Sequence, residues 1–246
     1  MKNIRLNISD NDFLKIFLIK DYSLLWFSSF TSMLSMQIRI IATGFILYDI
    51  TGSGLSLGML GIIQLFFQLP SILYGGVLAD FFKRTTIITI SQSFGTVVIF
   101  ILFYLTATEL INEWHIYIST ALLSINSTIG GPARSALTAN LVPKKLLINA
   151  VAANTATMQI GSVAAPILFG LFTVSFDASY PLLIGSIAAL ISAITCILIE
   201  NDNYIKNTQK MSPLKNIVEG FIYVKEHPIL PGLYLLDIGV TVVSFY

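Results

Sequence analysis

Two arginines and one aspartate lie inside long apolar stretches, and these charges are the residues best suited to chemistry. Between Tyr22 and Tyr48 the only charged side chain is Arg39, and between Ile116 and Val142 it is Arg134. Asp237 is the acidic residue deep in the last apolar run. A charge at the centre of a membrane helix costs about 2.5–3.5 kcal/mol on insertion scales, so each should face water or a partner.

Arg39 has two interpretations. It lies about 17 residues into its apolar run, roughly 25 Å at the rise of an α-helix, and therefore in the outer half. There it could attract an anionic or catecholate-like molecule into a water-filled cavity. Alternatively, its long side chain reaches the outer headgroups.

Arg134 and Asp237 each leave two alternatives as well. Arg134 precedes Pro143 by about 13 Å of helix, where it could serve a cavity or gate or could anchor in the inner headgroup region. Asp237 could couple proton movement, because such coupling needs a group whose proton affinity changes between states. It could equally be a polar residue near a helix end.

Side-chain amides add hydrogen-bonding groups to the same apolar runs. They could bind a small molecule, or bond between helices at about 0.6 kcal/mol each. They are Gln37, Gln64, Gln68, Asn126 and Gln159.

The elements that carry these residues follow from composition and length. Of the 246 residues 55% are hydrophobic and 11% are charged, less than half the charged share of a typical soluble domain. Stretches long enough to cross about 30 Å of hydrocarbon are counted as spans. They are Tyr22 to Tyr48, Thr51 to Ala79, Thr85 to Thr108, Ile116 to Val142, Leu146 to Phe176 and Ala178 to Ile199. We therefore predict an all-α polytopic membrane protein with six transmembrane helices and a partial seventh.

Orientation follows from the basic residues, which mark the cytoplasmic side of bacterial inner-membrane proteins. Except for Arg39 and Arg134, all Lys and Arg lie on alternate connections, beginning with the N-terminal segment. The opposite connections hold Asp49, Glu109, Glu113 and Asp177. This pattern predicts a multi-pass protein of the bacterial cytoplasmic (inner) membrane with a cytoplasmic N-terminus.

The chain then divides into four parts. They are a cytoplasmic N-terminal segment (1–21), a six-helix bundle (22–199), a cytoplasmic central loop (200–228) and a truncated seventh transmembrane helix (229–246). Within the loop, apolar residues from Leu214 to Ile222 recur at helical spacing and predict an amphipathic helix on the membrane surface. It could be a simple tether.

The fifth span combines small residues with a proline. Gly161 and Gly170 allow another helix to approach closely. Pro166 between them should kink or interrupt the helix, as ordinary packing or as a functional hinge.

Several classes of function are not supported. A net charge of +1 without a basic stripe gives no sign of nucleic-acid binding. No nucleophile motif, paired intramembrane aspartates, phosphate-binding loop or metal-ligand cluster appears, so we expect neither an enzyme nor a cofactor. A channel would need a pore-lining ring or a re-entrant filter, and the connections on the outer side look too short to form one.

Three segments together resemble the major facilitator superfamily. The turn 75–84 is similar to its signature between helices two and three, with Gly76, Asp80 and Arg84 matching. Residues 131–136, with 140–143 and 149–150, are similar to the drug- and siderophore-export branch that includes macrolide efflux and enterobactin exporter proteins. Residues 161–170, with Ala165 before Pro166, loosely resemble the exporter signature of helix five.

This resemblance implies the N-terminal half of a twelve-helix fold, built from two inverted three-helix repeats. It implies a cavity between two halves near the bilayer midplane, lined by the polar residues above. It assigns Gly76, Asp80 and Arg84 to a cytoplasmic gate, although the turn could simply set topology.

The expected function is secondary active transport: efflux of a small amphipathic molecule, such as a siderophore or drug, by alternating access. The expected partners are the lipid bilayer, that substrate and possibly a missing C-terminal half. Because the last apolar run stops at Tyr246, the alternative is a truncated, non-transporting half-carrier.

Overall fold

Helices make up every regular element in the described part of the computed structural model, which comprises residues 12–81, 83–175, 177–200, 223, 227 and 230–244. They are α1 (Asp12–Lys15), η1 (Ile16–Leu18), α2 (Lys20–Thr51), α3 (Gly54–Phe81), α4 (Arg84–Ala107), α5 (Glu113–Leu141), η2 (Lys144–Leu146), α6 (Leu147–Ser175), α7 (Tyr180–Ile197) and α9 (Leu230–Ser244). The chain forms two compact units, Met1–Lys206 and Asn207–Tyr246. The first holds α1 to α7, and α9 belongs to the second.

Local sequence explains where the long helices end. Gly52 takes the left-handed conformation (φ 61°) that suits glycine, and its N–H donates to the carbonyl of Tyr48 at 2.7 Å, which closes α2. Asn112 and His115 form a reciprocal cap at the start of α5, where the Asn112 side chain accepts from the His115 N–H at 3.1 Å. Pro143 follows α5 and cannot continue it.

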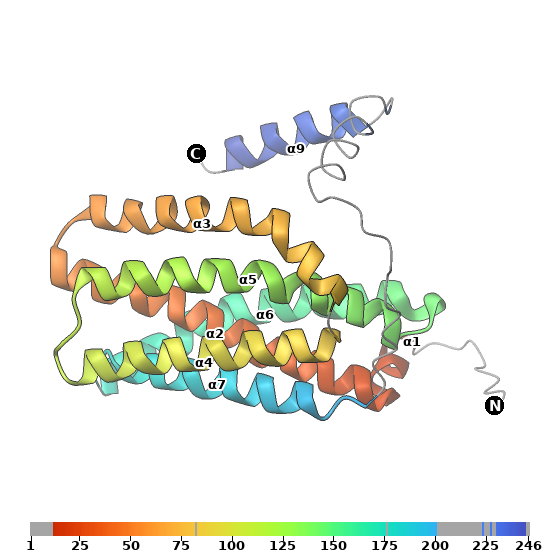
Figure 1. Ribbon diagram of the computed structural model, residues 1–246, viewed down its shortest axis with the longest axis horizontal. Helices are drawn as coiled ribbons and strands as arrows, with labels where there is room; N and C mark the ends of the chain where they lie inside the picture. The colour runs from red at the N-terminus through yellow and green to blue at the C-terminus, as the bar shows by residue number, and fades with distance from the viewer. Residues whose placement is uncertain are drawn as a thin grey trace. The chain divides into compact units, whose positions relative to one another are not determined.

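The six long helices of the first unit form one bundle (Figure 1). Helix α7 packs against α2 and α4, and α4 also packs against α5. Helix α5 packs in turn against α3, while α6 packs against α2. Helices α2 and α5 meet in the interior of the bundle. These two central helices carry Arg39 and Arg134.

The packing has an internal two-fold pattern. Exchanging α2 with α5, α3 with α6 and α4 with α7 converts the main contacts into one another, and it leaves the α2–α5 and α4–α7 contacts unchanged. The α2–α6 contact becomes α5–α3, for example, and α2–α7 becomes α5–α4. The exception among the described contacts is α6–α7, whose counterpart α3–α4 is weaker. Two three-helix segments therefore occupy corresponding places, as expected for repeats.

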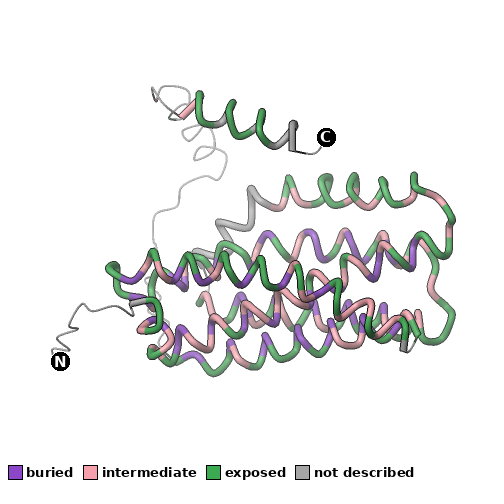
Figure 2. Tube along the Cα trace, turned by 180° about the vertical axis from the view of Figure 1, so that it is seen from behind, coloured by how far each residue is buried: buried purple, intermediate pink, exposed green. Residues whose placement is uncertain are grey.

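Helices α3 and α6 are the least covered by the rest of the bundle (Figure 2). None of residues 54–71 of α3 is buried. In the most apolar stretch of α6, only 17% of the residues are buried. In α7 that share is 44%. The exposed side chains of α3 are large and apolar, including Leu55, Ile62 and Phe66. The open surface is therefore one that hydrocarbon or another protein can cover.

Five helices of the described part are long and apolar enough to cross a membrane. They are α2, α3, α4, α6 and α7, with α3 counted by its residues 54–71. The prediction of six spans is thus confirmed for five. Helix α5 has 29 residues but lower hydropathy, because it carries several polar residues that lie buried against neighbouring helices. Across the described residues the predicted all-helical architecture is confirmed, and its five apolar helices fit a multi-pass membrane protein.

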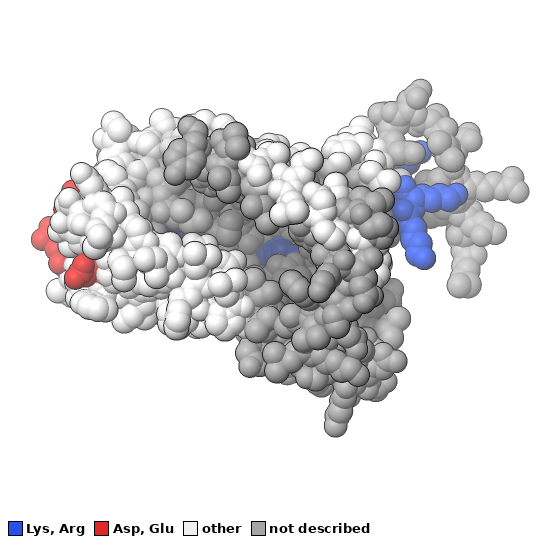
Figure 3. Space-filling model, turned by 90° about the horizontal axis from the view of Figure 1, so that it is seen from above, with Lys and Arg blue, Asp and Glu red and all other residues white. Residues whose placement is uncertain are grey.

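Charged side chains separate toward the ends of the bundle. On the face shown in Figure 3, acidic atoms gather at one end and basic atoms at the other, and further basic atoms lie in a hollow between them. Asp49, Glu109, Glu113 and Asp177 belong to the connections at the acidic end. The predicted amphipathic helix of the central loop lies outside the described residues.

Candidate functional site

Arg134 joins three helices through hydroxyl groups. Its Nη1 donates to the hydroxyls of Ser28 (3.2 Å) and Ser29 (3.0 Å) on α2, and its Nη2 donates to Ser192 (3.0 Å) on α7. Arg134 itself lies on α5, two residues after Pro132. We call these four residues the arginine–serine junction. The forked guanidinium can reach two helices at once because its nitrogens point in different directions.

The serine hydrogens are directed away from the guanidinium. Ser28 Oγ donates to the carbonyl of Ser192 at 2.9 Å, and Ser192 Oγ donates to the carbonyl of Ser28 at 2.8 Å. Ser29 Oγ donates to the carbonyl of Leu25 at 2.8 Å. Each hydroxyl oxygen is then left to accept from Arg134. The junction thereby binds a cation with neutral groups and ties α2, α5 and α7 together.

No carboxylate balances this charge within the described residues, since none lies within 4 Å of Arg134. Ser28 and Ser192 are fully buried. A buried cation without a counter-charge is expensive unless its donors are satisfied. The three hydroxyls accept three of the five N–H donors from two neighbouring helices, so the geometry is that of a fastening between helices.

Arg39 is placed differently. In the described part of the chain its guanidinium forms no hydrogen bond or ion pair, and the residue is half-buried in the middle of α2. Ser28, Ser35 and Arg39 recur at spacings of seven and four, so they share one stripe of the helix. Arg39 thus lies about 16 Å further along α2 than Ser28.

The amide side chains fall into two groups. Asn126 Nδ2 donates to the carbonyl of Ser91 at 2.9 Å, so it bonds α5 to α4. The four glutamines singled out in the sequence form no side-chain hydrogen bond to any described residue. Gln37 and Gln68 are half-buried, and Gln64 and Gln159 are exposed. The unpaired amides lie on α2, α3 and α6, the last two being the least covered helices.

At the basic end, Arg84 begins α4 and its Nη1 donates to the carbonyl of Ala136 on α5 at 2.7 Å. This bond joins the turn after α3 to the end of α5. Gly76 and Asp80 lie in the last turns of α3, and their side-chain surroundings are outside the described part. The gate assignment stays a prediction.

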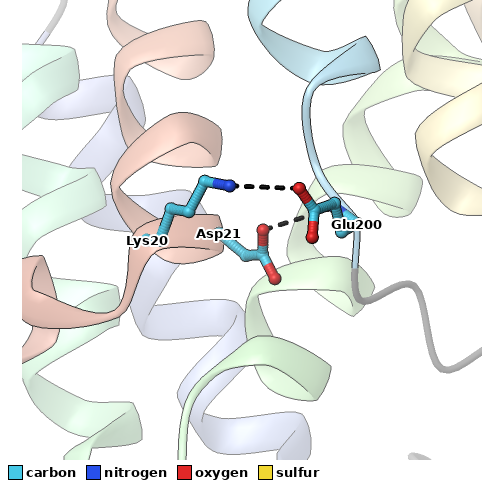
Figure 4. Close-up of polar contacts among 3 residues, drawn as sticks. All are labelled: Lys20, Asp21 and Glu200. Carbon is cyan, nitrogen blue, oxygen red and sulfur yellow. Dashed lines mark hydrogen bonds and ion pairs between the residues drawn. The ribbon is translucent and has the colours of Figure 1, made fainter.

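A second link closes the same end of the bundle (Figure 4). Lys20 Nζ lies 3.1 Å from Glu200 Oε1, with both side chains about three-quarters exposed. The backbone N–H of Glu200 donates to Asp21 Oδ1 at 3.3 Å. The start of α2 and the residue after α7 are therefore held together. No sequence pattern predicts this contact between residues far apart in the chain.

Helix α6 brings Gly161 against α2. A Cβ at Gly161 would lie 2.8 Å from Met33 Cγ, whereas a Cβ at Gly170 would meet nothing within 4 Å. The helix continues from Leu147 to Ser175 through Pro166, so the proline does not interrupt it. Asp237 is exposed on α9 in the second unit.

Sequence reasoning missed Ser28, Ser29 and Ser192. Hydroxyls in apolar helices usually bond to a carbonyl of their own helix, as Thr43 does with that of Arg39 at 2.8 Å. Serines that meet across helices look the same in a sequence. The one available signal was Arg134, because a cation in an apolar run requires acceptors.

Comparison with known proteins gives two findings. The model of the family described as Major Facilitator Superfamily matches residues 25–246. A Bacillus subtilis (strain 168) protein named "Uncharacterized MFS-type transporter YfiS" is 26% identical to this chain over 178 residues. That match covers 70% of this chain and 42% of the Bacillus protein, so the chain spans less than half the length of this relative.

Proposed function

The chain belongs to the Major Facilitator Superfamily, whose members carry out membrane transport, and from this membership we propose that it works in secondary active efflux. The cargo is a small amphipathic molecule, such as a siderophore or drug, moved by alternating access. The described bundle forms one wall of the substrate path, and a second bundle forms the other.

The observation that carries the proposal is the unpaired guanidinium of Arg39. Because it forms no bond to described residues, its cost in the apolar band is unrelieved within the bundle. A water-filled path relieves that cost and offers the cation to an anionic group. The other arginine within an apolar run, Arg134, already has three hydroxyl acceptors. We therefore assign anion recognition to Arg39 and helix fastening to Arg134.

The unpaired glutamines support the same path. An amide facing hydrocarbon leaves its donors and acceptors unsatisfied, which is costly. Gln37, Gln64, Gln68 and Gln159 therefore favour a wet or protein-covered surface over a lipid-covered one. We assign Gln37, Gln64, Gln68 and Gln159 to the substrate path.

We assign the gate to the turn that contains Gly76, Asp80 and Arg84. Arg84 holds the carbonyl of Ala136, so movement of α3 and α4 at this end is linked to α5. We assign proton coupling to Asp237, the acidic residue inside the apolar run of α9. Proton movement down its gradient is then coupled to transport, because Asp237 binds a proton in one state of the transporter and releases it in the other.

Helix α5 is included as a sixth crossing, with the N-terminus in the cytoplasm. Cysteine labelling tests both statements, since Glu109 precedes α5 and Lys145 follows it. In a Cys196→Ser background, intact cells should label Glu109→Cys with a membrane-impermeant maleimide and protect Lys145→Cys. Labelling of both positions from outside would contradict a crossing by α5.

Transport itself is tested in inside-out membrane vesicles, in which export from the cytoplasm becomes uptake. Vesicles from cells expressing the chain should accumulate tritiated 2,3-dihydroxybenzoate, a catecholate anion, when a proton gradient is imposed. The cation tetraphenylphosphonium should accumulate less. Uptake that equals that of vesicles without the protein, or that survives a protonophore, would contradict the proposal.

A further inference from the structure

The short helices before α2 are fixed to the bundle at its basic end. Ile16 is fully buried and lies in one apolar cluster with Val142, Leu146 and Ala150. The ring of Phe17 meets that of Trp26 edge-on, with centroids 5.1 Å apart. The segment Asp12–Leu18 is therefore a packed part of the first unit.

The other side of this segment is apolar and exposed. Phe13 is 46% exposed, Leu14 57% and Leu18 84%. A folded chain in water would gain by covering these side chains. At the point where α2 enters a membrane, acyl chains and headgroups can cover them.

Basic residues surround the same cluster. Lys15 precedes the buried Ile16, and the exposed Lys144 and Lys145 precede the buried Leu146. Lys20 is offset by Glu200 at 3.1 Å. Lys15, Lys144 and Lys145 add three ammonium groups to the segments that pack in this cluster, and basic groups near exposed apolar side chains attract anionic lipid headgroups.

The opposite end of the bundle has the reverse character. Its connections carry Asp49, Glu109, Glu113 and Asp177, and no Lys or Arg lies in those described turns. Trp114 lies there, 65% exposed and next to Glu113. The chain thus contains its own control, an exposed tryptophan at an end without lysines.

We propose that α1, η1 and η2 form a binding site for anionic phospholipid. In this site Lys15, Lys144 and Lys145 hold the headgroup, and Phe13, Leu14 and Leu18 contact the acyl chains. The assignment of this site to the inner leaflet rests on the proposed cytoplasmic N-terminus, and the binding site itself does not. The site is separate from the substrate path, and its test involves no transport.

Trp26 reports on the site because its ring meets Phe17 and stacks on Phe30 at 6.0 Å. The full chain with Trp114→Phe is reconstituted in phosphatidylcholine vesicles containing a small fraction of dibrominated lipid. Brominated phosphatidylglycerol should quench Trp26 about two- to tenfold more effectively than brominated phosphatidylcholine, given three lysines at the surface. In a Trp26→Phe chain, Trp114 should show no such preference.

Charge variants decide what the preference means. Lys15→Gln, Lys144→Gln and Lys145→Gln together should remove it, while arginine at the three positions should keep it. Equal quenching by the two lipids in the parent chain would overturn the proposal, as would a preference that survives the glutamine variant. Folding of each variant is checked by the protection of Cys196 from a thiol reagent, because this residue is fully buried in the native bundle.

Discussion

Ser28 and Ser192 each donate to the other's backbone carbonyl, at 2.9 and 2.8 Å, across the contact between α2 and α7. The two hydroxyl oxygens are thereby presented to Arg134 on α5. Three helices meet at this point, in the half of the bundle nearer its basic end. A single arginine and neutral partners can hold them because three of its N–H donors find hydroxyl acceptors on the two other helices.

Removing one hydroxyl should weaken the bundle. Ser192→Ala deletes an acceptor of Arg134 and a bond to Ser28, and we expect a loss of about 1–3 kcal/mol. For a chain of this size that lowers the melting temperature by at least about 2–4 °C. The melting temperature can be measured in detergent with a thiol-reactive fluorogenic dye. Cys196 is the only cysteine and is buried, so the dye reacts with it when the bundle unfolds.

Ser127→Ala is the matched control. Ser127 donates only to the carbonyl of Ser124 in its own helix and is exposed. Its replacement should leave the melting temperature within about 1 °C, as for most surface substitutions. If both alanine variants melt at the temperature of the parent, the junction does not stabilise the bundle.

Arg134→Lys should be nearly as destabilising as Arg134→Gln. The three N–H donors of a lysine share one nitrogen, so they cannot span Ser29 on α2 and Ser192 on α7 as the two guanidinium nitrogens do. The thiol-exposure assay should show both variants melting several degrees below the parent. Full recovery by lysine would mean that only the charge matters, which would contradict the fastening role.

Two glycines of α6 should differ sharply on substitution. Gly161→Ala places a Cβ 2.8 Å from Met33 Cγ and should cost about 1–3 kcal/mol through overpacking. Gly170→Ala meets nothing within 4 Å and should be neutral or stabilising by up to about 1 kcal/mol from helix propensity. Melting temperatures of the two variants make the comparison. Equal effects would contradict the close approach of α6 and α2.

The exposed ion pair between Lys20 and Glu200 should contribute little. With both side chains about three-quarters exposed, its worth is at most about 1 kcal/mol. Glu200→Gln should lower the melting temperature by less than about 4 °C, and salt should shrink the difference. The Glu200 N–H bond to Asp21 uses the backbone and survives this substitution. A large loss that salt does not reduce would contradict this estimate.

The sequence predicted the helices well because apolar run length determines a crossing. The run from Tyr22 to Tyr48 lies within α2, and that from Ala178 to Ile199 contains α7. It predicted less well where polar residues are satisfied inside the bundle. Helix α5 is the example: its serines and Asn126 lower its hydropathy, yet Asn126 bonds to α4.

For the functional residues too, the sequence identified the costly groups but not the contacts that they make. Arg39 and Arg134 were recognisable as costly charges, and the sequence left their roles open. Their difference lies in neighbours: Arg134 meets serines from two other helices, and Arg39 meets none in the described part. Such meetings depend on how helices rotate about their axes, which an apolar pattern does not specify. The packed segment Asp12–Leu18 was also missed, because four and three residues are too few for a periodic signal.

The most direct test of the account is the transport activity of Arg39 variants. Inside-out vesicles carrying Arg39→Gln should lose at least about tenfold in gradient-driven uptake of 2,3-dihydroxybenzoate, because a charged hydrogen bond to the anion is lost. Arg39→Lys should keep part of it, and Lys20→Gln, a change at an exposed cation, should keep all of it. Uptake by Arg39→Gln equal to that of the parent would contradict the placement of Arg39 in the substrate path.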